Sequence, residues 1–131
     1  MAEKEIGKSF LEASYWGFAG LIGKTVSRDL IFTPLANALS QNPTYGNPLF
    51  DSGPNFIQAI GYAMCIDEII SNFTKSRIQQ TLATIGIMAA GILATEIAKP
   101  LLMNQPIMPT DILAEAGGLL VALIAARVVQ A

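Results

Sequence analysis

Long apolar runs separated by short polar breaks dominate the pattern of hydrophobic and polar positions along the chain. The clearest run, residues 78–95, contains 18 positions without a charge. Another run begins at Asp111, and a third follows Pro54, a residue that suits the first turn of a helix. Runs of this kind are typical of helices that are buried in a core or cross a membrane. We therefore predict helices at residues 55–71, 78–99 and 111–129.

The first forty residues are harder to divide. An apolar, aromatic segment around Tyr15 and Trp16 is interrupted by KTVSRD, residues 24–29, and then resumes. Neither piece has the ~20 residues that span hydrocarbon. Two alternatives stay open for residues 1–40: one piece lies in the membrane interface while the other crosses, or one tilted helix runs through both. Residues 40–54 contain three prolines and no Lys or Arg, so we predict an ordered loop there.

The composition indicates a membrane protein. The chain has 131 residues, of which 52% are hydrophobic and only 14% are charged, and its mean hydropathy is +0.47. Soluble domains carry about 25% charged residues. We predict one all-α domain over residues 1–131, folded as a polytopic transmembrane helical bundle. A soluble all-α domain with unusually apolar helices is the competing interpretation.

The distribution of basic residues predicts a topology. Lys and Arg occur near the N-terminus, between the second and third predicted helices, and at the C-terminal end, whereas residues 40–54 and 104–110 contain none. Because cytoplasmic segments are enriched in Lys and Arg, this pattern favours four crossings with both termini in the cytoplasm. Three crossings would export one basic terminus. The expected location is a bacterial-type inner membrane or a membrane derived from it.

Several kinds of function are disfavoured. The chain has no His and a single cysteine, Cys65, so it lacks the commonest general base and metal ligand and has no disulfide or CxxC site. A net charge of −2 provides no basic surface for nucleic acid. We therefore expect no catalytic residues, no metal site, no cofactor and no nucleic-acid partner.

Small residues recur at four-residue spacing in the last two predicted helices. Residues four apart share one helix face, and small side chains on that face let two backbones approach closely, as helices in lipid do. The short connection between these helices indicates that the two faces pack as an antiparallel hairpin. The two stripes are Gly86, Ala90, Ala94 and Ala98, and Ala114, Gly118, Ala122 and Ala126.

Acidic residues near the same connection form the second candidate site. Asp111 and Glu115 share one face of the last helix, and Glu96 ends the preceding one. Asp111 is placed to cap its helix or to face the positive helix end. Glu115 lies deeper, where a carboxylate in hydrocarbon needs a partner, and Lys99 is the nearest base. We call Glu96, Lys99, Asp111 and Glu115 the polar clasp; the alternative is that it is a proton or ligand site.

A second group of charges lies at the end of the helix predicted at residues 55–71. Asp67 and Glu68 close that helix, and Lys75 and Arg77 follow shortly after them. We interpret the four side chains as a surface charge cluster in which the basic residues offset the acids.

The segments around these acids resemble the VanZ-like envelope proteins over roughly residues 52–127. The similar stretches are NFIQAIGYA around Tyr62, ATEIAK, and PTDILAEAGGLLVALIAA. Glu96, Asp111 and Gly118 fit the family's Glu, Asp and Gly, whereas Glu115 stands where Asn is usual, Gln58 where His is usual, and the family's Arg before the Asp is missing. The resemblance implies a bacterial envelope protein, linked in some members to glycopeptide resistance, with no established reaction.

Three functions follow as expectations. The first is a non-catalytic membrane subunit that packs against lipids, other subunits or itself in a larger assembly, either a bioenergetic complex or a membrane-containing virion. The second is a stand-alone VanZ-like protein. The third is a small transporter or proton-handling protein that uses Glu96 and Glu115.

Overall fold

Nearly all of the described chain is helical. The computed structural model describes residues 6–38, 48–107 and 109–130, and no strand occurs in these ranges, so the prediction of an all-α fold is confirmed. The helices join end to end into four rods in this part of the chain. They are α1 (Ile6–Ser27) continued by η1 (Arg28–Phe32) and α2 (Thr33–Ala38), then α3 (Pro48–Ile70), then α4 (Arg77–Leu93) continued by η2 (Ala94–Ala98) and α5 (Lys99–Leu102), and finally α6 (Pro109–Gln130).

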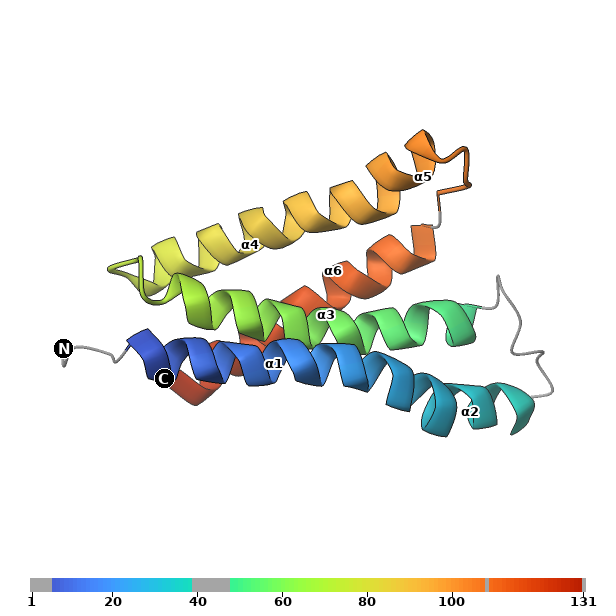
Figure 1. The fold of residues 1–131 in the computed structure, drawn as a ribbon, viewed down its shortest axis with the longest axis horizontal. Helices are drawn as coiled ribbons and strands as arrows, with labels where there is room; N and C mark the ends of the chain where they lie inside the picture. The colour runs from blue at the N-terminus through green and yellow to red at the C-terminus, as the bar shows by residue number, and fades with distance from the viewer. Residues whose placement is uncertain (1–5, 39–47, 108, 131) are drawn as a thin grey trace.

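The central rod is α3 (Figure 1). It makes its most extensive contacts with α1 on one side and with α6, which crosses behind it, on the other. The third rod starts beside the end of α3 and diverges from the other rods toward α5. Both ends of the chain lie at the same end of the molecule, and α2 and α5 lie at the opposite end.

Glycine lets α3 touch its two neighbours backbone to backbone. A Cβ added to Gly61 would lie 2.5 Å from the Cα of Gly20 on α1. On the other side of α3, a Cβ added to Gly118 of α6 would lie 2.6 Å from the carbonyl oxygen of Phe56. Neither position has room for any side chain, so both helix crossings depend on glycine.

The first rod is helical throughout residues 6–38, so both pieces of the predicted first segment belong to one helix. The segment KTVSRD does not interrupt it, because charged residues are adequate helix formers and only glycine and proline strongly oppose a helix. The Ser27 hydroxyl donates to the carbonyl of Lys24, and Arg28 pairs with Asp29 at 3.6 Å on the exposed side.

Both π-helical segments end two residues before a proline. In η1 the Thr33 N–H donates to the carbonyl of Arg28, one residue before Pro34. In η2 the Lys99 N–H donates to Ala94, one residue before Pro100. The wider turn moves away the carbonyl that the proline ring would otherwise meet, so the helix continues.

Two predicted boundaries are therefore wrong. The second rod begins at Pro48 rather than at residue 55, and Pro54 lies inside it; residues 39–47 of the predicted loop lie outside the described residues. The third rod, predicted to end at residue 99, continues through Pro100 to Leu102 and closes at Asn104, four residues after Pro100, with φ 55°. There the Gln105 N–H donates to the carbonyl of Pro100 at 2.8 Å, the bond of a Schellman cap.

The predicted pairing of the two small-residue stripes is also corrected. Three of the α6 residues, Gly118, Ala122 and Ala126, are buried, but the close contact of this face is with α3. On the third rod, Gly86, Ala90, Ala94 and Ala98 are all exposed. The residues that α4 buries instead are Gln80, Thr84 and Met88. The atoms nearest to a Cβ added at Gly118 all belong to α3, namely to Phe56, Ala59 and Ile60, so the α6 stripe fits against α3 rather than α4.

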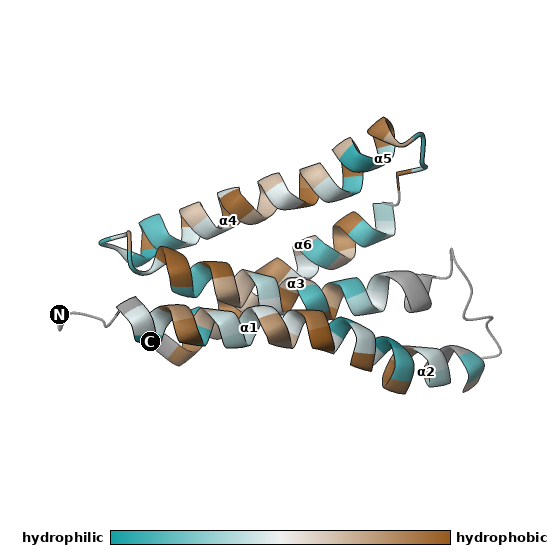
Figure 2. Ribbon diagram, in the orientation of Figure 1, coloured by the Kyte–Doolittle hydropathy of each residue, from teal (hydrophilic) through white to brown (hydrophobic). Residues whose placement is uncertain are grey.

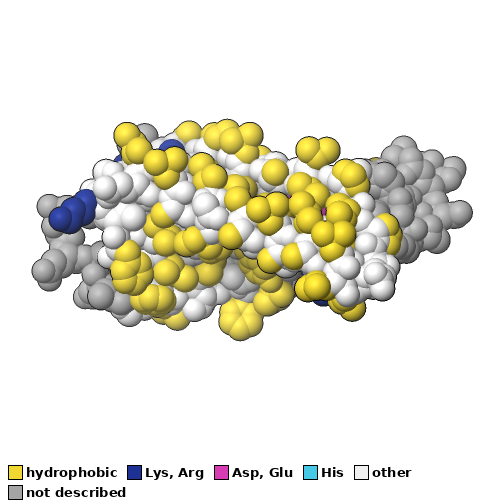
Figure 3. All heavy atoms as spheres, turned by 90° about the horizontal axis from the view of Figure 1, so that it is seen from above, with side chains coloured by type: hydrophobic (Ala, Val, Ile, Leu, Met, Phe, Trp, Pro, Cys, Tyr) yellow, Lys and Arg dark blue, Asp and Glu magenta, His cyan; other side chains and the backbone are white. Residues whose placement is uncertain are grey.

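Large apolar side chains cover the outside of the bundle. Exposed examples include Phe18 at 64%, Leu82 at 64% and Leu120 at 59% of their full surface. Figure 2 shows hydrophobic residues along the middle of the rods, and Figure 3 shows one face on which hydrophobic side chains extend along the length of the molecule. Two rods, Arg77–Leu102 and Pro109–Val129, are long and apolar enough to cross a membrane.

Candidate functional site

The first polar site lies at the α2 and α5 end of the molecule, where four elements meet. Glu115 on α6 is within electrostatic reach of Glu96 on η2, Asp111 on α6 and Lys24 on α1, most strongly of Glu96. Asp111 lies in the first turn of α6, where the helix dipole favours a carboxylate. It also accepts a hydrogen bond of 2.9 Å from Ser52, a buried residue near the start of α3. We call these five residues the acidic cluster.

The acidic cluster differs from the polar clasp in its cation. Glu96, Asp111 and Glu115 come together, but Lys99 is exposed and the cation facing Glu115 is Lys24. Lys24 replaces Lys99 because the hairpin expected from the sequence included neither the π turn of η2 nor the continuous first rod that carries Lys24. The Oε2 atom of Glu115 is buried and has no hydrogen-bond partner among the described residues. Glu115 therefore lies beside two other acids and one lysine, with one carboxyl oxygen that no described group satisfies.

The second polar site is a buried ion pair at the opposite end of the bundle. Asp67 on α3 and Arg127 on α6 form a two-point contact, with Nη2 to Oδ1 at 2.7 Å and Nη1 to Oδ2 at 3.1 Å. Gln80 and Thr84 of α4 each donate a further hydrogen bond of 3.1 Å to the same carboxylate. The Arg127 Nε donates to the Thr81 hydroxyl at 2.8 Å. This network joins three rods and is nearly saturated with donors.

The interpretation of Asp67 as part of a surface charge cluster is wrong. Asp67 is only 4% exposed, and it pairs with Arg127 rather than with Lys75 or Arg77, although those are nearer in sequence. Its neighbour Glu68 accepts a hydrogen bond of 2.8 Å from Ser9 of α1. One signal could have found the pair: each residue lies three positions before the end of an apolar helix, and an ion at that depth needs a partner of opposite charge.

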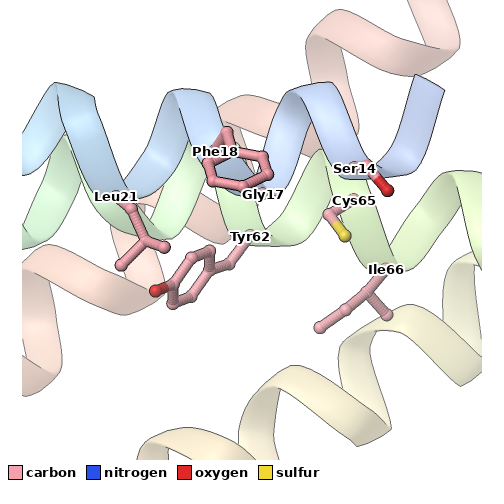
Figure 4. Close-up of a pocket in the computed structure, with 7 residues that line it drawn as sticks. All are labelled: Ser14, Gly17, Phe18, Leu21, Tyr62, Cys65 and Ile66. Atoms are coloured by element: carbon pink, nitrogen blue, oxygen red, sulfur yellow. The ribbon is translucent and has the colours of Figure 1, made fainter. Parts of the chain in front are cut away.

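The third site is an open apolar groove, which we call the α1–α3 groove. Its volume is about 300 Å³. Figure 4 shows Phe18 and Leu21 on α1 and Tyr62, Cys65 and Ile66 on α3 around this space. The complete lining is Ser14, Gly17, Phe18, Leu21, Tyr62, Cys65 and Ile66.

The polar groups of these sites are mostly engaged in contacts within the bundle. In the described part of the chain, no three Cys, Asp or Glu side chains are arranged to hold a metal ion. The hydroxyls of Ser14 and Tyr62 are engaged with their own helices, with Ser14 donating to Phe10 and Tyr62 accepting from Gln58. What the geometry offers is packing surface, a saturated ion pair and an acidic cluster.

Comparison with known proteins adds no relative. No protein-family model, no curated protein and no solved structure matches the chain. The resemblance to VanZ-like proteins therefore stays a prediction.

Proposed function

We propose that the protein is a non-catalytic integral membrane protein that packs against other subunits of a larger membrane-embedded assembly. The observation that carries this proposal is the outer face of the third rod. That rod is long and apolar enough to cross a membrane, yet only 11% of its apolar window is buried within the chain, compared with 28% for α6. Its small residues, Gly86, Ala90, Ala94 and Ala98, all lie on the exposed side.

Small side chains on such a face favour a helix as the neighbour. In lipid, hydrophobic burial does not drive helices together, and association depends on close packing, which small residues permit. A Cβ added at Gly86 would meet no described atom within 4 Å, so this part of the chain leaves the face open. A helix of another subunit would bring its backbone close along the whole stripe.

The membrane placement that we propose has four crossings with both termini in the cytoplasm. Two observations support it: the two chain ends lie at one end of the molecule, and the turn between α3 and α4 at that end carries Lys75 and is followed by Arg77. A bacterial-type inner membrane, or one derived from it, suits this charge pattern. The assembly would be a bioenergetic complex or a membrane-containing virion.

Purification from the native source tests this proposal. The protein is extracted in mild detergent, and mass spectrometry identifies the chains that travel with it. Stoichiometric co-migration with other proteins is the expected result and would name the assembly. A folded monomer alone would contradict the proposal, and recovery in the soluble fraction without detergent would contradict membrane insertion.

A matched pair of variants locates the interface. Gly86→Leu puts a bulky side chain on the small-residue stripe, whereas Gly91→Leu makes the same change elsewhere on α4, at a position that also has no described atom within 4 Å of an added Cβ. We expect Gly86→Leu to reduce recovery of the co-migrating chains and Gly91→Leu to leave it unchanged. Equal recovery with both variants would exclude the stripe as the contact face.

The acidic cluster favours a second candidate, a transporter or proton-handling protein. Glu115 faces Glu96, and its Oε2 atom lacks a partner among the described residues. Ionisable groups inside membrane helices mark ion and proton paths. Proton flux into vesicles that contain the purified protein, lost in Glu115→Gln while the fold is retained, would support this candidate. A stand-alone VanZ-like protein is the remaining alternative, and it should be stable without any partner.

A further inference from the structure

Gly17 lies in the lining of the α1–α3 groove and adds no side chain to it. Phe18 and Leu21 form one wall on α1, and Tyr62 and Ile66 form the other on α3. A Cβ added to Gly17 would meet only the Sγ atom of Cys65, at 3.6 Å, which is an ordinary contact distance. Unlike Gly20 and Gly61, this glycine is not required for the helices to cross. Its missing side chain leaves space instead.

The groove offers almost nothing to a polar ligand. Its lining contains only two hydroxyls, and each makes a hydrogen bond within its own helix: Ser14 donates to the Phe10 carbonyl at 2.9 Å, and Tyr62 accepts from Gln58 at 3.0 Å. No charged residue is part of the lining. A polar ligand would lose its hydration and gain few partners in return, so the groove favours an apolar occupant.

The space has the size of a hydrocarbon segment. An apolar cavity of about 150 Å³ holds benzene, so about 300 Å³ holds roughly ten to twelve carbon atoms. Along α1 the lining extends from Ser14 to Leu21, a rise of roughly 10 Å at ~1.5 Å per residue. An elongated, flexible chain fits that shape.

The groove is also continuous with the exposed apolar surface of α1. Phe18 and Leu21 are 64% and 51% exposed, so its wall is part of the surface that would face hydrocarbon. We infer that the α1–α3 groove holds one acyl chain of a membrane phospholipid. This inference rests on the proposed membrane placement, and it adds a specific lipid site to it.

Native mass spectrometry of the full-length protein tests the site. The protein is released from detergent micelles after titration with dipalmitoyl phosphatidylethanolamine, and the same titration is repeated with dipalmitoyl phosphatidylglycerol. The test variant is Gly17→Leu, whose side chain fills part of the groove. The control is Gly91→Leu, which makes the same substitution on an exposed face of α4 with no described atom near the added Cβ.

We expect the wild-type protein and Gly91→Leu to retain one lipid with either headgroup, and Gly17→Leu to bind about tenfold more weakly. Loss of contact with roughly two methylene groups produces a change of that size. Equal lipid retention by Gly17→Leu and the control would overturn the site. If Gly17→Leu fails to fold, Gly17→Ala replaces it as the test variant, because its Cβ keeps the 3.6 Å separation from Cys65. We expect Gly17→Ala to lose less lipid affinity than Gly17→Leu, and an unchanged affinity would overturn the site.

Labelling of Cys65 provides an independent readout. Its thiol borders the groove, so added lipid should slow its reaction with an apolar maleimide in the wild-type protein. Unchanged labelling would count against the acyl chain, and photo-crosslinking from Cys65 to another protein chain would assign the groove to a partner helix. A protein that inserts in the membrane but retains no lipid overturns only this inference, whereas a protein that is soluble without detergent overturns the proposed function.

Discussion

Replacing Asp67 with asparagine removes one charge from the ion pair that joins α3, α4 and α6. The substitution keeps the shape of the side chain, but its amide nitrogen must face one of the donors that now point at a carboxylate oxygen. Those donors are two guanidinium nitrogens of Arg127, the amide of Gln80 and the hydroxyl of Thr84. Asparagine therefore creates a donor facing a donor and removes the negative charge that faces Arg127.

The burial of the pair sets the magnitude of the effect. The Asp67 side chain is 6% exposed and the Arg127 side chain is 22% exposed. Removal of one partner from a buried pair costs about 3–5 kcal/mol. Because the Arg127 side chain is partly exposed, we expect Asp67→Asn to lower the free energy of unfolding by about 3 kcal/mol, near the bottom of that range.

Reversible unfolding in mixed detergent micelles, followed by circular dichroism, measures this free energy. Asp29→Asn is the control, since Asp29 pairs with Arg28 at 3.6 Å on the surface with side chains 62% and 41% exposed; it should change stability by less than about 1 kcal/mol. The double variant Asp67→Asn, Arg127→Gln should cost less than the sum of the single variants. The interpretation that this pair stabilises the contact between the rods would be refuted by either of two results. The first is a double-variant loss of unfolding free energy equal to the sum of the two single losses, and the second is an Asp67→Asn effect no larger than that of Asp29→Asn.

Three further predictions use the same preparations. Gly61→Ala should destabilise the protein by about 3 kcal/mol or more, because its Cβ would lie 2.5 Å from the Gly20 Cα, whereas Gly86→Ala should change stability by less than about 1 kcal/mol. Glu115→Gln should leave the free energy of unfolding unchanged or raise it slightly, since it replaces an acid that faces Glu96 and Asp111 with a neutral side chain of the same shape; a clear loss would restore the polar clasp as a stabilising contact. In a Cys65→Ser background, an impermeant maleimide added outside cells should label Gln105→Cys but not Lys75→Cys, and the reverse result would invert the proposed topology.

Apolar runs predicted the rods well, and prolines and charges predicted their limits poorly. The helix expected at residues 111–129 is found within two residues, because nothing in that run opposes a helix. Pro54 was expected in the first turn of its helix but lies inside α3. The helix predicted to end at residue 99 continues past Pro100 after a π turn, and a turn of that kind has no clear sequence signal. The sequence could have revealed Asp67 and Arg127 as partners only by comparing helix depths, since sixty residues separate them. Likewise the α6 stripe was visible as a packing face, but the choice of α3 as its partner depends on the fit around Gly118.

The two functional proposals use opposite faces of one short segment. The last residue that α4 buries is Met88, and beyond it the rod diverges from the bundle toward α5 (Figure 1). In η2, Ala94 and Ala98 are exposed, whereas Glu96, about half a turn from each, is half-buried and faces Glu115. A partner helix on the stripe would therefore contact the face of this segment that points away from Glu115. Substitutions at Ala94 should then affect assembly and substitutions at Glu96 should affect proton or ligand chemistry, so the two roles can be separated within a few residues.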